Sequence, residues 1–126
     1  MKKLSLFLAL SLFTCFSFAQ QKVALVIGNN DYKEIVRLSN AVNDANLMEI
    51  TLQKLGFTVQ KILNAPKTEF ERELFAFNRN YRSADVRLFY FAGHGAQYQG
   101  ENYLLPVDFP DLEEKDMEGI SLVVLS

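Results

Sequence analysis

One segment constrains the fold of this chain more than any other: residues 86–96, with the sequence VRLFYFAGHGA. The largely apolar run from Val86 to Ala92, closed by a glycine, is typical of a strand buried on both faces of a parallel sheet. His94, the chain's only histidine, follows it between two glycines. Because open parallel sheets bind ligands at the carboxyl ends of their strands, we expect His94 at that edge. It is the best candidate for a proton-transfer group, and the alternative is a structural histidine on a turn.

Strands and helices alternate along the chain before this segment. The β-branched run Val23–Ile27 predicts a buried strand, and turn residues follow it from Gly28. A more polar strand, suited to a sheet edge, is expected at Phe57–Leu63. Between them the spacing predicts an amphipathic helix of about four turns. Ser39, Asn40 or Asn43 could cap the start of this helix, and Gly56 follows its end. Its apolar face consists of Ala41, Ala45, Met48, Leu52 and Leu55.

A second helix is expected after the second strand. Thr68 and Glu71 have the spacing of a capping box, and one helix face carries Phe70, Leu74, Phe77 and Tyr81. Strands separated by helices imply right-handed crossovers and a parallel sheet. We therefore predict a doubly wound α/β fold with helices on both faces and the partial strand order 2-1-3. In that order the loop from Gly28 through Asp44 meets the turn at residues 93–95 at a switch point.

After Gly95 the sequence predicts irregular structure, with a short extended piece at residues 103–107 and an acidic segment at 108–118. Its carboxylates could hold a hard cation such as calcium, but they lack the spacing of a calcium-binding loop. A solvated acidic loop is the favoured interpretation of Asp108, Asp111, Glu113, Glu114 and Asp116. Residues 120–126 begin an apolar segment without a terminating signal, which indicates a domain interrupted before its sheet is complete.

The amino terminus has the composition of a secretory signal. Two lysines precede an apolar segment at residues 4–18, and the small residues near its end suit cleavage after Ala19. The apolar run is shorter than the roughly 20 residues of a spanning helix, and the residues before Cys15 do not suit a lipoprotein. We therefore expect residues 1–19 to be a signal peptide and residues 20–126 to be exported, to the periplasm or outside the cell, without a stable membrane anchor.

Charge and cysteine content disfavour several functions. The formal net charge is −2 and no basic cluster occurs beyond the amino terminus, so nucleic-acid binding is not expected. The residues at 28–30 lack the glycine spacing and the lysine of a phosphate-binding loop, which disfavours a nucleotide-binding domain. Cys15 is the only cysteine and lies in the segment expected to be removed. Nothing after residue 20 can therefore form a disulfide or act as a thiol nucleophile.

Several blocks of sequence occur in order: ALVIGN at 24–29, LSNAVNDA at 38–45, LGF at 55–57, FYFAGHG at 89–95 and YLLPVD at 103–108. Together they resemble the larger-subunit part of caspase-like cysteine peptidases, the bacterial metacaspase-type members in particular. The resemblance extends from about residue 22 to 120. It implies a three-layer caspase-like fold and a cysteine endopeptidase acting on protein or peptide substrates. We expect no metal in the site and no cofactor, with calcium as the alternative.

The resemblance also implies roles for individual residues. His94 matches the catalytic histidine, a general base and acid, and Gly95 matches the residue whose backbone N–H helps to bind the oxyanion. Asp44 matches an acidic residue of the primary specificity pocket, which pairs with arginine or lysine of the substrate. The alternative for Asp44 is an acidic residue favoured by the helix dipole. Ala41 and Ala92 depart from the small or thiol-bearing pocket residues of the family, which leaves the pocket shape open.

The nucleophile is missing from these residues. In caspase-type enzymes the cysteine follows the histidine by about 50 residues, which from His94 falls beyond Ser126. We therefore expect the chain to be inactive by itself. It is either the front part of an exported caspase-like endopeptidase, cut before the strand that carries the nucleophile, or a non-catalytic pseudo-peptidase that acts as an interaction module. An uncovered sheet edge would then favour self-association.

Overall fold

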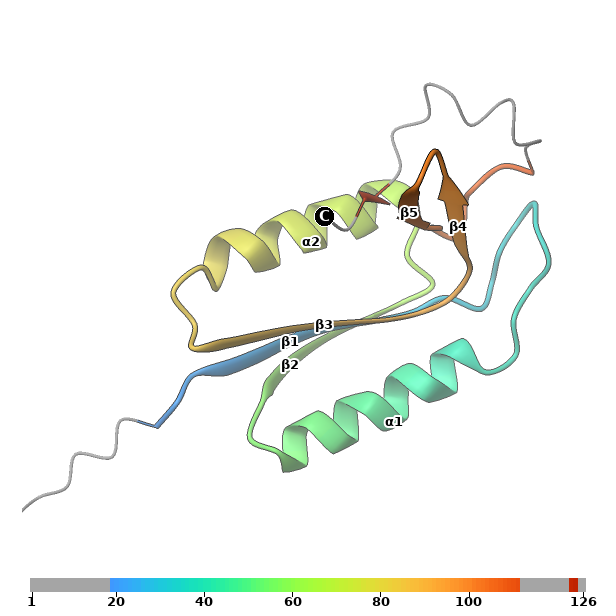
Figure 1. The fold of residues 1–126 in the computed structure, drawn as a ribbon. Helices are drawn as coiled ribbons and strands as arrows, with labels where there is room; N and C mark the ends of the chain where they lie inside the picture. The colour runs from blue at the N-terminus through green and yellow to red at the C-terminus, as the bar shows by residue number, and fades with distance from the viewer. Residues whose placement is uncertain (1–18, 112–122, 125–126) are drawn as a thin grey trace, which may run out of the picture.

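Three parallel strands form the central sheet of the computed structural model, which describes residues 19–111 and 123–124. They are β1 (Lys22–Gly28), β2 (Thr58–Leu63) and β3 (Val86–Ala92), in the order β2-β1-β3. Helix α1 (Ala41–Lys54) covers one face and helix α2 (Lys67–Asn80) covers the other (Figure 1). The three-layer α/β fold, the mainly parallel sheet and its strand order are thus confirmed.

The central strand β1 supplies the core on both sides of the sheet. Its residues from Val23 to Ile27 are each at most 1% exposed. Side chains of a strand alternate between its two faces, and both faces of β1 are covered by a helix. The face toward α2 packs Val23, Leu25 and Ile27 against Phe70 and Phe77, and the face toward α1 packs Ala24 and Val26 against Ala45 and Leu52. The predicted apolar faces of both helices are therefore confirmed, except for Leu55, which lies just beyond α1 and is 60% exposed.

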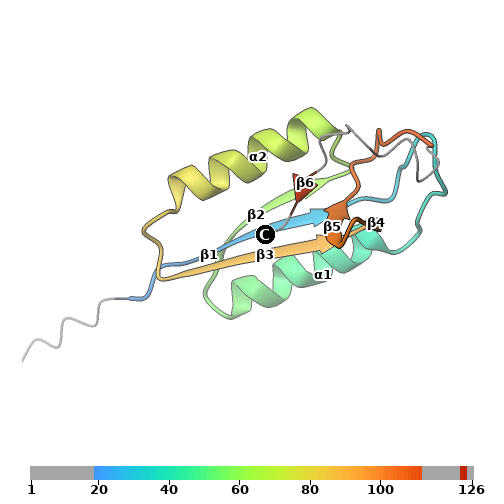
Figure 2. The same ribbon diagram turned by 45° about the horizontal axis from the view of Figure 1, so that its top comes forward.

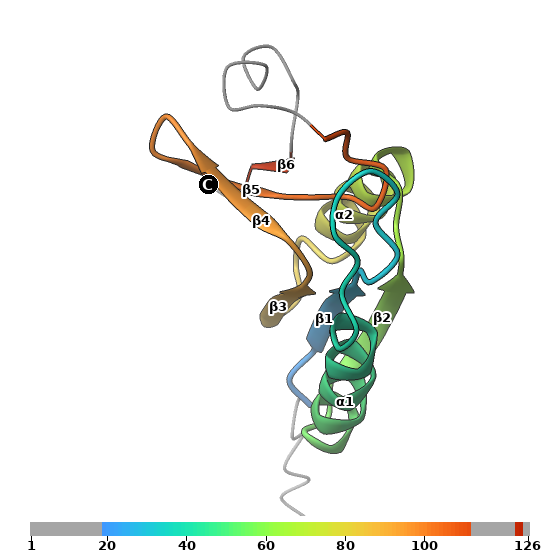
Figure 3. The ribbon, with the colours of Figure 1, turned by 90° about the vertical axis from the view of Figure 1, so that its right-hand side faces the viewer.

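Strand β3 contacts the core on both faces of the sheet, but it is less buried than its apolar run predicts. Most of its side chains are half-buried and Arg87 is exposed. Within the described residues β3 pairs with β1 alone and lies at an edge of the sheet (Figure 3). An edge strand has a neighbour on one side only, which leaves part of its surface accessible. The other edge is β2, as its polar residues predict.

The capping box predicted at Thr68 and Glu71 is also wrong. Helix α2 begins at Lys67, with Pro66 as its N-cap residue and no side-chain cap of its own. The backbone N–H of Lys67 instead donates to Oδ1 of Asp108 at 2.8 Å. A carboxylate at this end accepts from a free N–H group and complements the helix dipole. The cap therefore comes from a segment distant in the sequence.

The irregular structure predicted after Gly95 is replaced by a hairpin of β4 (Gly95–Tyr98) and β5 (Glu101–Leu104). Gln99 and Gly100 at its tip have φ values of 49° and 82°, and two positive φ angles are what a two-residue type I′ hairpin loop requires. Strand β5 also pairs with the two-residue strand β6 (Val123–Val124). The hairpin lies beyond the carboxyl ends of β1 and β3 (Figure 2).

Some predicted features lie outside the described residues. These are residues 1–18, which hold nearly all of the expected signal peptide, and most of the acidic and apolar segment from 112 onward. In the part that the structure describes, neither helix is long and apolar enough to cross a membrane. Over the same residues, no three acidic, histidine or cysteine side chains come together as a metal site would need.

Candidate active site

The loops that follow the three parallel strands meet at one edge of the sheet, and the buried Asn29 ties them together. Its Oδ1 accepts from the backbone N–H of Ala65 at 2.9 Å, and its Nδ2 donates to the carbonyl of Leu105 at 3.3 Å. Its own backbone N–H donates to the carbonyl of Ala92 at 2.9 Å. Asn29 is 0% exposed, and a buried amide with satisfied hydrogen bonds holds its partners in fixed positions.

His94 lies directly beyond β3 and against the loop that follows β1, as the switch-point argument predicts. Its Nε2 is 2.7 Å from the carbonyl oxygen of Val36, and its ring meets the ring of Tyr32 edge-on at 4.6 Å between centroids. In a neutral imidazole, the nitrogen that faces a carbonyl carries the hydrogen. The contact therefore places the hydrogen on Nε2 and leaves Nδ1 as the proton acceptor of the ring.

The phenol of Tyr32 is buried beside His94. Its Oη accepts from the backbone N–H of His94 at 2.8 Å and donates to the carbonyl of Leu105 at 3.0 Å. Burial raises the pKa of Tyr32, and hydrogen bonds with the His94 backbone and the Asn29 side chain act in the opposite direction. A Cβ atom at Gly93 would lie 2.5 Å from Cζ of Phe91 and 2.6 Å from this Oη, so any larger residue before His94 would displace both side chains.

The backbone N–H of Gly95 points away from the hairpin. Gly95 pairs with Leu104, and in the preceding pair the N–H of Leu105 donates to the carbonyl of His94 at 2.9 Å. Antiparallel ladders alternate between pairs that bond to each other and pairs whose N–H and C=O groups point outward. Gly95 is in an outward pair, so its N–H is directed to the open side of β4, one residue from His94.

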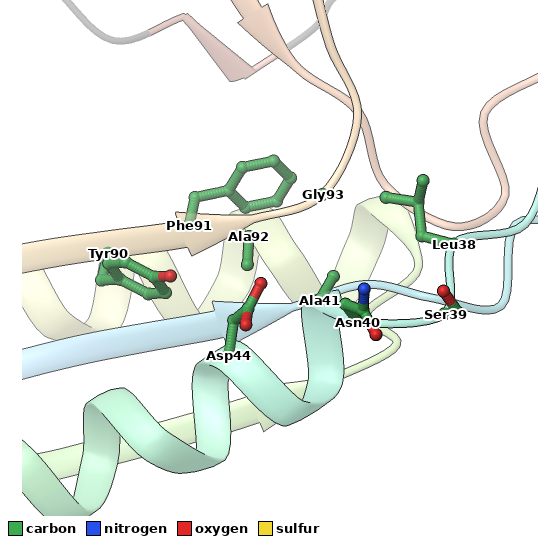
Figure 4. Close-up of a pocket in the computed structure, with 9 residues that line it drawn as sticks. All are labelled: Leu38, Ser39, Asn40, Ala41, Asp44, Tyr90, Phe91, Ala92 and Gly93. Atoms are coloured by element: carbon green, nitrogen blue, oxygen red, sulfur yellow. The ribbon is translucent and has the colours of Figure 1, made fainter.

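Asp44 lines a pocket of about 400 Å³ between α1 and β3 (Figure 4). The pocket walls are residues 38–41 before and at the start of α1, and residues 90–93 of β3 and its end. Figure 4 shows the carboxylate directed toward Tyr90 and Ala92. Asp44 is exposed to solvent and takes part in none of the ion pairs among the described residues. His94 does not line this pocket, but the adjoining Gly93 does.

The first turn of α1, which carries Asp44, is fixed by Asn30 rather than by its own N-cap residue. Asn40 occupies the N-cap position without a side-chain hydrogen bond. Oδ1 of Asn30 instead accepts from the backbone N–H of Val42 at 3.0 Å, and the N–H of Asn30 donates to Oδ1 of Asn64 at 2.9 Å. The loop after β1 is thereby tied both to α1 and to the end of β2.

Sequence reasoning missed Asn29, Tyr32 and Val36 at this edge. Val36 acts through its backbone carbonyl, so its side chain gives no signal. Asn29 and Tyr32 lie in a segment interpreted as turn residues, and their partners come from residues more than 30 positions away. A polar residue close after the apolar run from Val23 to Ile27 is the signal that could have indicated Asn29.

Comparison with known proteins identifies the family of this chain. The caspase domain of peptidase family C14 matches residues 21–122. The human mucosa-associated lymphoid tissue lymphoma translocation protein 1 is 32% identical over 93 residues, which cover 74% of this chain and 11% of that protein. Caspase-1 of Rattus norvegicus is 33% identical over 78 residues, which cover 60% of this chain and 19% of that protein. The alignments thus span only a small part of either relative. The chain belongs to the caspase-like family of cysteine peptidases.

Proposed function

We propose that this chain is the histidine-bearing part of an exported, metacaspase-type cysteine endopeptidase that cleaves after arginine or lysine. The observation that carries the proposal is the setting of His94. Its Nε2 faces the Val36 carbonyl, its Nδ1 is left as an acceptor, and the outward N–H of Gly95 lies one residue away. A proton acceptor beside a backbone donor that points outward is the pair of groups that acyl transfer requires.

In the proposed reaction a cysteine thiol, supplied from outside residues 16–126, attacks the scissile carbonyl. The thiol proton passes to Nδ1 of His94, and the Nε2 hydrogen bond to the Val36 carbonyl keeps the ring oriented. The N–H of Gly95 donates to the oxyanion of the tetrahedral intermediate. His94 then gives its proton to the leaving amine, and water hydrolyses the thioester with His94 again as the base.

The proposed preference for arginine or lysine rests on Asp44. Its carboxylate faces a pocket next to the end of β3 and is free of ion pairs among the described residues. A guanidinium entering the pocket would meet the carboxylate in a charge-assisted, bidentate contact. Because Asp44 is exposed, solvent weakens this contact, and we expect selectivity for basic side chains rather than tight binding.

A second candidate function is favoured by the open edge of β3. Among the described residues this strand pairs only with β1, so its other edge presents backbone N–H and C=O groups to a further strand. Residues 16–126 contain no cysteine, which agrees with a chain that is inactive by itself. In this alternative the chain is a non-catalytic module that self-associates through β3.

The test compares the 126-residue chain with a product of the extended reading frame that carries a cysteine about 50 residues after His94. Both are assayed on fluorogenic peptides ending in arginine or lysine. We expect turnover only by the extended product and its loss on His94→Ala. A folded, monodisperse dimer without activity in either form would support the interaction module instead. Fractionation of the producing cells tests export.

A further inference from the structure

We propose that the hydroxyl group of Tyr32 is a positioning group for His94, acting as a spacer inside the β4–β5 ladder that sets the imidazole against the Val36 carbonyl. That this positioning matters for catalysis rests on the proposed function of His94 as the general base.

The ladder between β4 and β5 continues one pair beyond Gly95 and Leu104, to His94 and Leu105. One bond of that pair is direct, from the N–H of Leu105 to the carbonyl of His94 at 2.9 Å. The reciprocal bond is interrupted. The N–H of His94 donates to Oη of Tyr32 at 2.8 Å, and Oη donates to the carbonyl of Leu105 at 3.0 Å. In a regular antiparallel pair the two residues exchange both bonds directly, so an oxygen atom has been inserted into the ladder.

The inserted oxygen determines where the His94 backbone lies. A direct backbone hydrogen bond would bring the nitrogen of His94 to about 2.9 Å from the carbonyl oxygen of Leu105. With the hydroxyl between them, two hydrogen bonds in series separate these atoms, so they lie farther apart. Without the bridge, closing the pair would draw the backbone of His94 toward β5. Such a movement of the backbone would also change the distance between Nε2 and the Val36 carbonyl, which is now 2.7 Å.

Two further observations show that the surroundings are shaped around this oxygen. A Cβ atom at Gly93 would lie 2.6 Å from it and 2.5 Å from Cζ of Phe91, so the glycine leaves room for the hydroxyl beside the backbone. The carbonyl of Leu105 that anchors the bridge also accepts from Nδ2 of Asn29 at 3.3 Å, which fixes it independently. Burial raises the pKa of Tyr32, which keeps the hydroxyl protonated and able to accept and donate at once.

The experiment uses NMR of the ¹⁵N-labelled 126-residue chain, whose single histidine gives unambiguous ring signals. At alkaline pH, where an imidazole is neutral, ¹⁵N shifts report which ring nitrogen carries hydrogen. We expect the Nε2–H form to predominate in the natural chain. Tyr32→Phe keeps the ring and removes only the oxygen. It should lower the proportion of the Nε2–H form and speed hydrogen exchange of the His94 amide by about tenfold.

Tyr98→Phe is the matched control, because it removes a hydroxyl from the same hairpin without touching His94, and it should leave both signals unchanged. A merely structural Tyr32 would lower the unfolding temperature in Tyr32→Phe while the ring form and the His94 amide exchange stay as in the natural chain. That result would overturn the proposal.

If Tyr32→Phe does not fold, the natural chain decides the question. A buried, bonded hydroxyl gives a slowly exchanging proton, and a cross-peak between it and the His94 amide proton supports the bridge. A Tyr32 hydroxyl that exchanges freely with water overturns it. None of these NMR measurements depends on peptidase activity. The proposed peptidase function would fail separately, if the extended product stayed active after His94→Ala.

Discussion

Nε2 of His94 lies 2.7 Å from the carbonyl oxygen of Val36, although 58 positions separate the two residues. The contact joins the end of β3 to the loop that follows β1. It uses a backbone atom of a residue that is itself 77% exposed, so the path of the loop matters more than the side chain at position 36. That path is fixed by Asn30 and Asn64, whose side chains accept backbone N–H groups on either side of it.

Replacement of Gly28 by alanine should destabilise the fold and displace α1. A Cβ atom at this position would lie 2.6 Å from Cβ of Ala45 and 2.7 Å from the carbonyl oxygen of Ala41. Relief of such overlap costs about 1–3 kcal/mol of the free energy of unfolding, measured by urea denaturation. Gly95→Ala is the matched control, since its nearest atom would be 3.4 Å away. Equal stability of the two variants would contradict the assigned packing.

Removal of the Asp108 carboxylate should weaken the start of α2. Asp108→Ala leaves the N–H of Lys67 without its acceptor, and loss of such a cap costs about 0.5–2 kcal/mol. Asp111→Ala, at an exposed position nearby, should change the free energy of unfolding by less than about 0.5 kcal/mol. If urea denaturation gave similar losses of unfolding free energy for both variants, the effect of Asp108 would come from its negative charge and not from a cap on α2.

The stability of the chain should fall at alkaline pH because of Tyr32. Burial raises its folded-state pKa above the ordinary value of 10.0, since a phenolate is poorly solvated there. Its contribution is therefore full below about pH 10 and is lost as the pH rises from there through the folded-state pKa. The difference in unfolding free energy between the natural chain and Tyr32→Phe should shrink above pH 10. A difference that stays constant across that range would contradict the assignment.

Asp44→Asn should reduce the affinity of the pocket for basic ligands. The variant keeps the size of the side chain and removes the charge, so binding of N-acetylarginine amide should weaken by about tenfold. The backbone signals of Tyr90 and Ala92, on the pocket wall, report the binding in an NMR titration. Asp85→Asn, before the opposite end of β3, is the control. Loss of affinity for the uncharged citrulline analogue as well would argue against a charge contact.

The sheet order and both helices follow from local patterns that the sequence displays directly. The apolar run of β1, the helical spacing from Ala41 to Leu52 and the aromatic face of α2 each report burial within a single element. The alternation of strands and helices then leaves few topologies. For the same reason the meeting of His94 with the loop after β1 could be predicted, because it depends only on the order of strands.

Features made by distant partners could not be predicted. The cap of α2 comes from Asp108, and the acceptor for His94 is a backbone carbonyl, neither of which leaves a pattern in the local sequence. The β4–β5 hairpin turns at Gln99 and Gly100, and glutamine is not a residue that signals a type I′ loop. The exposure of β3 depends on which strands pair with it, which its own apolar residues do not show.

The most direct test of the account is the effect of His94→Ala on kcat/KM in the cysteine-bearing extended product, measured with an arginine-terminated fluorogenic peptide. If His94 moves the proton of the thiol and of the leaving amine, kcat/KM should fall by about 10²–10⁴-fold while the circular dichroism spectrum and unfolding midpoint stay close to those of the parent. A folded His94→Ala variant that hydrolyses the peptide as fast as the parent would contradict the account.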